Sequence, residues 1–477
     1  MSDGLRDKAK KGLFWNTIER IVTNGIQFLL TIVLARLLSP DDYGVIAMPS
    51  IFLAIAQVLV DSGFANALIR KPNLEEKDLS TAFYFNIIVG FVTYSILFLA
   101  SPLIATFFKT PILSQLLKVT ALVVFINSMG IVQQAVMTKH LDFKTQAIIT
   151  SISFFFSGGI GVWMAYSGYG VWALVFQQVS AALLRVGMLW FFGRWKPLWI
   201  WSKESFRYLW NFGSRVIVIG LLDTIYNNVY SFVIGKRYDA KDLGNYTRAQ
   251  HFVDLPISNI NGVMQKVTLP LLSQIQNDNV RLKSIYLKLI EMTSLLIIPP
   301  MFGLAAMARP LVLVLIGKEW EGCVIFFQIL CIARIWTPFN AINVNLLQVK
   351  GRTDLLLNLE IAKKIVITIV LGLTFYRGVF YLVGGFAVCT FIAFVINTYY
   401  TKRLIGVSFW KQIKAIIPAV LISTCMLISV SVFNIISANV LFLLLGDILV
   451  CVAIYSGLAY AFKKETLFEL LSLIKRK

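Results

Sequence analysis

The sequence is poor in charge, in histidine and in paired cysteine. Charged residues make up 14% of its 477 positions and hydrophobic residues 58%, whereas a soluble protein of this length exposes far more charge. Two histidines lie far apart, and none of the five cysteines forms a Cys-x-x-Cys pair. Little material remains for a zinc site or a disulfide framework. These shortages exclude a soluble globular protein, and we expect neither a metal nor a cofactor.

Long apolar runs recur along the whole chain. Each has about 20 residues or more, enough to cross a hydrocarbon core of about 30 Å. The pattern predicts an all-α polytopic membrane protein with about fourteen transmembrane helices. The eighth span is too polar to face lipid, so we expect it to face inward. The expected spans centre near Asn24, Ala56, Gly90, Val124, Phe156, Gln178, Leu222, Asn259, Leu296, Ile335, Val366, Phe391, Ser423 and Val450.

The formal net charge of +20 has an explanation in membrane topology. Lys and Arg number 27 in one set of alternate loops and termini and 8 in the other. Cytoplasmic loops of membrane proteins are enriched in these residues, which predicts that both termini are cytoplasmic. No nucleic-acid-binding motif is visible, and we expect no nucleic acid partner.

A stretch near the start of the chain returns near its middle. Trp15-Asn16 with Arg20 matches Trp210-Asn211 with Arg215 at an offset of 195. The segment 34–44 matches 234–244 at an offset of 200. Repetition of a charged helix and its exit turn predicts two related helix bundles. Transporters are often built in this way, with the binding site at the repeat interface.

The repeat suggests boundaries along the chain. Residues 1–195 would form an N-terminal six-helix lobe and residues 208–405 a C-terminal one, joined by a linker over 196–207. The mix of Trp and Lys around this linker is typical of a helix lying at the membrane interface. Residues 406–477 would add two further transmembrane helices and a cytoplasmic tail.

Cations inside the apolar runs are the strongest candidates for function. A charge at the bilayer centre costs roughly 2.5–3.5 kcal/mol on insertion scales, so it needs a partner or a wet cavity. The first and seventh runs share an Asn-x-x-x-Arg spacing, which places both side chains on one helical face. The candidate substrate-binding residues are Asn16, Arg20, Asn211, Arg215, Arg248, Lys266 and Arg334.

Two interpretations of these cations stay open. They could line a cationic cavity between the lobes, or they could form salt bridges that only hold helices together. Arg185, late in the sixth run, could instead snorkel to the interface. The candidate acids for ion coupling are Asp61, Asp223 and Asp254. An ion-coupled transporter needs a carboxylate whose charge changes during its cycle, although a salt bridge to an arginine explains these acids equally well.

Asp41 and Asp42 in the first outer loop raise the alternative of an enzyme. Membrane glycosyltransferases that use polyprenyl-phosphate sugars carry acids in such a loop. Ser-Pro-Asp-Asp, however, is good turn and helix-start chemistry, and the repeat keeps Asp242 in the matching place. We therefore expect a structural role for these acids and no enzymatic activity.

Two stretches carry a resemblance to a known family. They are LARLLSPDDYGVIAM over 34–48 and VDSGFANALIRK over 60–71. The chain is similar to the polysaccharide transporters of the multidrug/oligosaccharidyl-lipid/polysaccharide exporter superfamily, the Wzx-like flippases. The resemblance implies a MATE-like fold, with two pseudo-symmetric six-helix lobes, a V-shaped cavity and two extra helices.

The same resemblance implies a function in the bacterial inner membrane. An undecaprenyl-diphosphate-linked oligosaccharide would pass from the cytoplasmic to the periplasmic leaflet by alternating access, for lipopolysaccharide, capsule or teichuronic acid assembly. Polysaccharide polymerases and glycosyltransferases are candidate partners. A drug or cation exporter of the same superfamily is an alternative, but its cavity would favour acids, whereas the intramembrane excess here is positive.

Overall fold

The computed structural model describes residues 23–61, 63–193, 195–436 and 440–475. Within these ranges every regular element is a helix and no strand occurs, which confirms the prediction of an all-α protein. The chain forms two compact units, Met1–Gly244 and Asn245–Lys477, called unit 1 and unit 2 below. Each is described by itself, and the lobe boundaries expected from the repeat stay a prediction.

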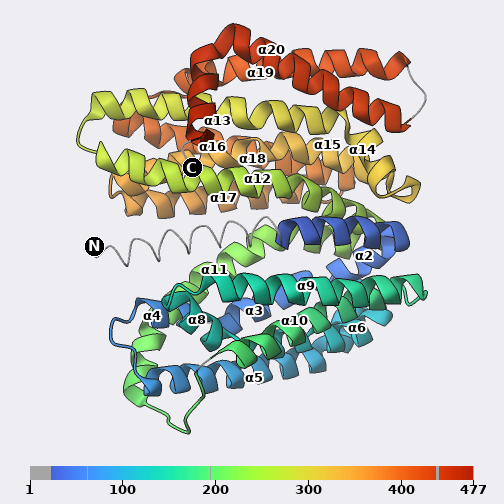
Figure 1. The fold of residues 1–477 in the computed structure, drawn as a ribbon, viewed down its shortest axis with the longest axis vertical. Helices are drawn as coiled ribbons and strands as arrows, with labels where there is room; N and C mark the ends of the chain where they lie inside the picture. Colours follow the sequence, from blue (N-terminus) through green and yellow to red (C-terminus); the bar gives the residue numbers. More distant parts are fainter. Residues whose placement is uncertain (1–22, 62, 194, 437–439, 476–477) are drawn as a thin grey trace. The chain divides into compact units, whose positions relative to one another are not determined.

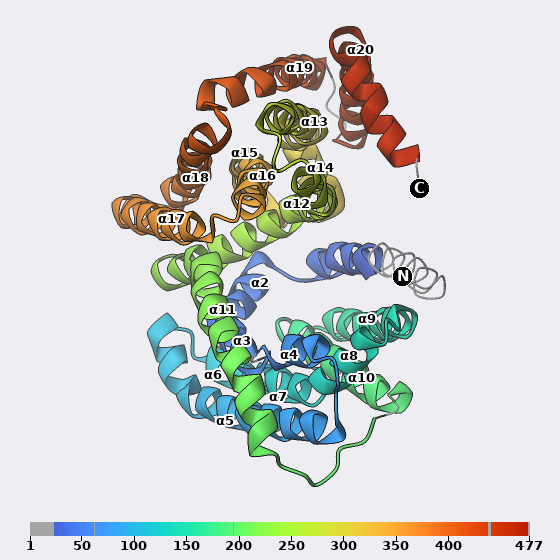
Figure 2. The same cartoon turned by 90° about the vertical axis from the view of Figure 1, so that its left-hand side faces the viewer.

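Unit 1 begins, in its described part, with a helix over Thr23–Leu37. Its further elements are α2 (Pro40–Ala47), α3 (Ser50–Asp61), α4 (Phe64–Arg70), α5 (Glu76–Phe108), α6 (Ile112–Thr120), α7 (Leu122–Ser128), α8 (Ile131–Lys139), α9 (Phe143–Tyr166), α10 (Trp172–Phe192), α11 (Lys203–Arg237) and the start of α12 (Ala240–Gln274). Helices α9 and α10 run side by side (Figure 1). Figure 2 shows α11 passing along α3 and α4, which it contacts.

Unit 2 contains most of α12 and the remaining helices. They are α13 (Asn279–Ala306), α14 (Ala308–Leu315), the short 3-10 helix η1 (Lys318–Trp320), α15 (Cys323–Arg334), α16 (Trp336–Val349), α17 (Thr353–Thr374), α18 (Val379–Ile405), α19 (Phe409–Ile436) and α20 (Val440–Lys475). Helix α13 packs along α19 and α15, while α18 packs against α15, α16 and α17. Between α13 and α16, the buried Tyr286 hydroxyl donates to Asn343 Oδ1 at 2.8 Å.

Eleven described helical spans are long and apolar enough to cross a membrane, counting α3–α4, α6–α8 and α15–α16 as one span each. The other three expected spans correspond to the helix Thr23–Leu37, whose described part is short, and to α12 and α17. Both α12 and α17 carry several charged residues, which lowers their hydropathy. The structure therefore agrees with a fold of about fourteen transmembrane helices.

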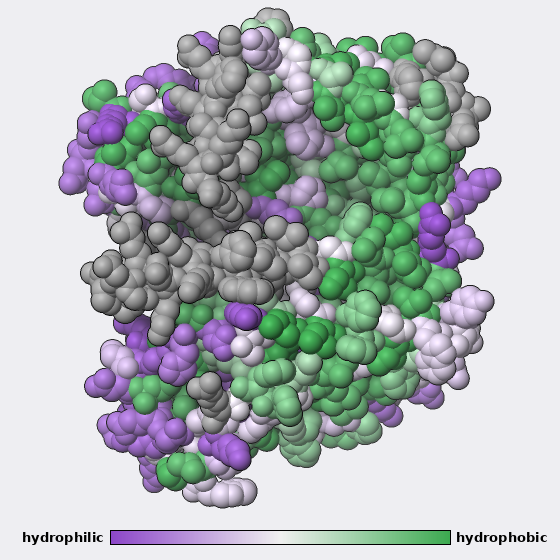
Figure 3. All heavy atoms as spheres, in the orientation of Figure 1, coloured by the Kyte–Doolittle hydropathy of each residue, from purple (hydrophilic) through white to green (hydrophobic). Residues whose placement is uncertain are grey.

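The outer faces of these helices are apolar. Leu99 and Leu103 on α5 are 75% and 74% exposed, and Phe155 and Trp163 on α9 are 66% and 65% exposed. On the face shown in Figure 3, hydrophobic residues cover the middle of the helices and hydrophilic ones collect towards their ends. Large apolar surfaces of this kind mark contact with a membrane.

The second span is interrupted where α3 gives way to α4. Gly63 lies at the break with a φ of +66°. A Cβ atom added to Gly63 would lie 2.9 Å from Val216 Cβ on α11. The left-handed backbone and the close approach of α11 therefore both favour glycine at this position. As a result α3 ends at Asp61, so a carboxylate stands at a break in a membrane span.

The Trp- and Lys-rich linker between α10 and α11 is not the helix that its composition predicted. Residues 195–202 form no helix. Trp195 Nε1 donates to Glu76 Oε2 at 2.7 Å, and Leu198 N donates to Ser80 Oγ at 3.0 Å. Side chains of α5 thus accept from groups of the linker, including a backbone N–H that a helix would have satisfied internally.

Candidate functional site

The predicted site residues are distributed over both units. Asn16 and Arg20 lie outside the described residues, and Lys266 lies on α12 with its side chain likewise outside the description. Four of the seven candidate substrate-binding side chains can therefore be placed. They are Asn211 and Arg215 on α11, Arg248 on α12 and Arg334 at the end of α15.

The Asn211 and Arg215 side chains lie on an exposed face of α11. Gly213 and Gly220 mark the opposite face of this helix, which packs against Gly63 and Val58. Among the described residues, Arg215 forms no ion pair. An exposed guanidinium can donate to an anionic ligand such as phosphate.

In unit 2 the structure brings Arg334 and Asp254 together. Arg334 Nη2 donates to Asp254 Oδ2 at 3.0 Å, and Arg334 Nε lies 2.7 Å from Asp254 Oδ1. The Phe386 ring lies 5.2 Å from the same guanidinium carbon. Half-buried Arg248 lies six residues earlier than Asp254 on α12. Asp254 therefore has a direct cationic partner, which is the salt-bridge interpretation that the sequence left open.

Unit 1 contains a chain of hydrogen bonds between an acid and an arginine. Gln57 Nε2 donates to Asp61 Oδ1 at 2.9 Å, Asn127 Nδ2 donates to Gln57 Oε1 at 3.1 Å, and Arg185 Nη2 donates to Asn127 Oδ1 at 2.8 Å. The chain crosses three helices, α3, α7 and α10. We refer to these four residues as the amide chain. It joins two charges that are 124 residues apart in the sequence, positions 61 and 185.

Arg185 has different surroundings from those that the sequence analysis expected. It does not snorkel, because its guanidinium is half-buried against Asn127. The Arg185 Nε atom is buried and has no hydrogen-bond partner among the described residues. The presence of Gln57 and Asn127 inside apolar runs could have indicated this contact, since polar side chains within the membrane usually pair with one another.

The third acid candidate lies in unit 1. Asp223 lies on α11 with an exposed side chain. Asp447 on α20 is fully buried, and no role was predicted for it. Within the described ranges, no three His, Cys, Asp or Glu side chains gather as a metal site requires.

Asp42 serves as a helix cap. Ser39 N donates to Asp42 Oδ2 at 3.0 Å, and Asp42 N donates to Ser39 Oγ at 3.2 Å. This reciprocal pair is a capping box at the start of α2, with Pro40 in the first turn. The carboxylate thus satisfies a backbone N–H that would otherwise lack a partner. The turn chemistry read from the sequence is confirmed.

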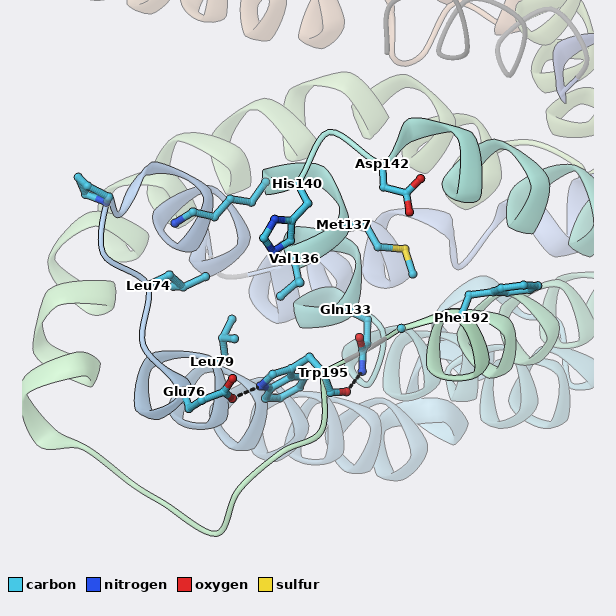
Figure 4. A pocket seen from close by; sticks show the side chains of 13 residues that line it. Leu74, Glu76, Leu79, Gln133, Val136, Met137, His140, Asp142, Phe192 and Trp195 are labelled. Carbon is cyan, nitrogen blue, oxygen red and sulfur yellow. Dashed lines mark hydrogen bonds between the residues drawn. The ribbon is translucent and has the colours of Figure 1, made fainter. Parts of the chain in front are cut away.

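Unit 1 contains a cavity of about 710 Å³ close to the linker, and Figure 4 shows the side chains that line it. Trp195 lies at one side, held by Glu76 through its indole and by Gln133, whose Nε2 donates to the Trp195 carbonyl at 2.8 Å. Asp142, at another edge of the cavity, accepts from Thr145 N and caps α9. The acids and the amide of this cavity are therefore engaged in fixing the linker and α9.

Comparison with known sequences identifies similar proteins. The family described as polysaccharide biosynthesis protein matches residues 33–325. An uncharacterized membrane protein in the cps region of Klebsiella pneumoniae is 26% identical over 403 residues, covering 84% of this chain and 83% of that protein. The teichuronic acid biosynthesis protein TuaB of Bacillus subtilis is 25% identical over 72% of both chains. The lipopolysaccharide biosynthesis protein WzxC of Escherichia coli is 24% identical over 75% of this chain and 73% of its own.

Comparison with solved structures shows the fold. The lipid II flippase MurJ in an inward closed conformation superposes with a TM-score of 0.77 at 16% identity, covering 96% of this chain and 99% of that one. An inward-facing multidrug resistance MATE family transporter superposes with a TM-score of 0.64 at 13% identity, over 80% and 94%. The expectation of a MATE-like fold is confirmed.

Proposed function

Because this chain belongs to the polysaccharide biosynthesis protein family, we propose that it is a flippase for surface polysaccharide assembly. Its substrate would be an undecaprenyl-diphosphate-linked oligosaccharide, moved from the cytoplasmic to the periplasmic leaflet of the inner membrane. The observation that carries this proposal is a fold shared with a lipid II flippase over 96% of the chain, together with the family match.

The names of the relatives support the substrate class. Two of them are named for the biosynthesis of teichuronic acid and of lipopolysaccharide, and a fold neighbour is named as a flippase of lipid II. Lipid II combines a polyprenyl tail, a diphosphate and a saccharide. We infer a substrate with the same three parts for this chain.

The diphosphate would be held by intramembrane arginines. Arg215 is the foremost candidate, because its exposed guanidinium is unpaired among the described residues. The planar fork of arginine binds two phosphate oxygens at once. Arg334 would have to exchange Asp254 for phosphate, so a weaker contribution is expected from it. The further proposed ligands are Arg20, Arg248, Lys266, Asn16 and Asn211.

Topology and partners belong to the same proposal. Both termini would be cytoplasmic, because cationic residues are concentrated in one set of loops. The two six-helix lobes would span residues 1–195 and 208–405, with 406–477 added to them. Glycosyltransferases would supply the lipid-linked oligosaccharide and a polymerase would consume it.

Two alternatives are less well supported. A polyprenyl-phosphate-dependent glycosyltransferase would need a carboxylate dedicated to chemistry in the first outer loop, but Asp42 is committed to the capping box of α2 and Asp41 is a first-turn acid of the same helix, where a carboxylate stabilises the helix N-terminus. A cation exporter would need an acidic site, but Asp254 is paired with Arg334 and Asp61 is bridged to Arg185. Neither acid is left uncompensated to hold a cationic drug.

Reconstitution tests the proposed function. The purified protein is placed in liposomes with a fluorescent undecaprenyl-diphosphate oligosaccharide, and a membrane-impermeant reagent reports how much of it lies in the outer leaflet. We expect protein-dependent exchange between leaflets and no sugar transfer. Folded protein that leaves the leaflets as separate as protein-free liposomes do would overturn the assignment.

A further inference from the structure

The opposite charges of Asp61 and Arg185 are linked through two amide side chains and not by direct contact. The carboxylate accepts from Gln57, the guanidinium donates to Asn127, and the two amides are hydrogen-bonded to each other. Electrostatic attraction also acts between the Asp61 carboxylate and the Arg185 guanidinium. Asn127 and Gln57 each donate from their nitrogen and accept on their oxygen, so the chain of dipoles runs in one direction from cation to anion.

The ion pair of unit 2 is the useful contrast. Arg334 contacts both carboxylate oxygens of Asp254, with its Nε 2.7 Å from Oδ1 and its Nη2 3.0 Å from Oδ2. Direct contact with a cation holds a carboxylate in its charged form. Asp61 receives only one neutral amide donor among the described residues, and it faces a cavity. Of these two acids, Asp61 is therefore the one that can change protonation without breaking a direct ion pair.

Asp61 is the one charged residue in the lining of the cavity that it faces. It lines a cavity of about 440 Å³ whose other lining residues come from α3, α4, α8 and α11 and from Gly63, and none of them is titratable. Charged or titratable groups on the neighbouring helices include Arg215 and Asp223 on α11 and Tyr94 on α5. Arg215 directly precedes Val216 of the cavity lining, and its side chain is exposed. Tyr94 packs in the apolar cluster of Val60, while Asp223 lies one turn beyond Gly220 of the cavity.

We propose that Arg185 is a second anion-binding residue, controlled by the protonation of Asp61 through Gln57 and Asn127. While Asp61 is ionised, the amide chain neutralises Arg185. When an anion reaches the guanidinium, Asp61 takes up one proton from water in the cavity and becomes a neutral carboxyl. On release of the anion, the same proton returns to water, so charge and protons balance over the cycle.

This inference rests on the proposed function only in naming the physiological anion, the diphosphate diester of the lipid-linked substrate. Anion binding and proton uptake must promote each other equally, since linked equilibria are reciprocal. Binding should therefore weaken as pH rises. A bound anion near Arg185 offsets the positive charge that favours ionised Asp61, so the neutral acid is favoured in the bound state.

Calorimetric titration of the purified full-length protein with dimethyl diphosphate tests the inference. This diester carries two charges and does not itself titrate between pH 5 and 8. We expect its Kd to rise by up to tenfold per pH unit within part of this range. Measurements in buffers of different ionisation enthalpy should show uptake of up to one proton per bound diester.

Single variants test each part of the amide chain separately. Asp61→Asn should bind with a Kd that no longer changes with pH and is at least as low as that of the wild type at pH 5. Arg185→Gln should raise Kd about tenfold or more. Gln57→Met keeps both charges but breaks the chain, and should flatten the pH dependence even if Asp61→Asn fails to fold. Asp278→Asn is the matched control, since Asp278 caps α13 and Asn caps equally well, and it should keep the full dependence.

Retention of the full pH dependence by folded Asp61→Asn or Gln57→Met would overturn the inference, as would unchanged affinity in Arg185→Gln. No step of this experiment requires flipping. If the protein flips the lipid-linked substrate but binds the diester without proton uptake, only the control of Arg185 by Asp61 is contradicted. A protein that binds with proton uptake but does not flip would contradict only the proposed function.

Discussion

Gly44 and Gly244 meet where the first turn of α2 crosses the first turn of α12. A Cβ atom added to Gly44 would overlap the backbone carbonyl of Ala240, and one added to Gly244 would overlap that of Pro40. The same offset of 200 residues relates Pro40 to Ala240 and Gly44 to Gly244. The contact is thus reciprocal, with each half of the repeated motif packing on its counterpart. This relationship explains why the repeat keeps a glycine at this place.

Alanine at either glycine should destabilise the protein. The neighbouring atoms are backbone, which cannot rotate away, so the helices must separate, and overpacking typically costs about 1–3 kcal/mol. The cost of Gly44→Ala plus Gly244→Ala should be less than additive, because both act on one contact. Thermal unfolding followed by tryptophan fluorescence in detergent measures it.

Gly159→Ala is the control for these variants, because a Cβ on Gly159 of α9 meets no atom within 4 Å. It should leave the unfolding temperature unchanged or slightly raised, since alanine is the better helix former. An unaltered unfolding temperature for Gly44→Ala would contradict the close crossing.

Breaking the ion pair of unit 2 should affect folding more than transport. Asp254→Ala leaves the partly buried Arg334 guanidinium without its counter-charge, which we expect to cost about 1–3 kcal/mol because both side chains are partly exposed. Replacing both residues by leucine should recover part of this loss. The folded fraction after solubilisation, measured by size-exclusion chromatography, reports the effect. A double variant as unstable as Asp254→Ala would argue against a pairwise interaction.

The carboxylate of Asp42 should matter for stability and not for chemistry. Asp42→Asn keeps an oxygen that can accept from Ser39 N, so surface polysaccharide should stay largely intact. Ser39→Ala removes the hydroxyl that accepts from Asp42 N and should cost about 1 kcal/mol. Complete loss of polysaccharide in Asp42→Asn at normal protein levels would instead favour the glycosyltransferase alternative.

Single cysteines in a background without the native five test the topology. Asp41→Cys should react with a membrane-impermeant maleimide in intact cells, whereas Lys8→Cys and Leu470→Cys should react only after the membrane is permeabilised. The expectation rests on the excess of Lys and Arg on one side of the membrane. Labelling of position 8 or 470 in intact cells would reverse the orientation.

Features that depend on residues close together in the sequence were predicted correctly. Apolar runs located most of the helices because a membrane span needs about 20 predominantly apolar residues. Ser39 and Asp42 predicted a helix start because a capping box is formed by residues three apart in the sequence.

Long-range contacts were not predictable in the same way. Arg185 looked like a snorkelling side chain because its partner Asn127 is 58 residues away. The linker at Trp195 looked like an interfacial helix, but its fold depends on Glu76 and Ser80 of α5. Composition does not reveal partners that only tertiary packing brings together.

The central claim is that intramembrane arginines bind the diphosphate of a lipid-linked oligosaccharide. A charge-assisted contact to phosphate is worth about 1.5–3 kcal/mol, so Arg215→Ala should weaken binding by roughly ten- to a hundredfold. Because Arg215 forms no ion pair among the described residues, its loss should leave the amount of folded protein unchanged. Arg215→Lys should keep part of the function, since the charge stays but the bidentate fork is lost.

The most direct measurement is a complementation assay with Arg20→Ala/Arg215→Ala, run beside a blot for the protein. The account predicts strongly reduced surface polysaccharide at a normal protein level, with partial recovery in Arg20→Lys/Arg215→Lys. Normal polysaccharide export by the double alanine variant would contradict it.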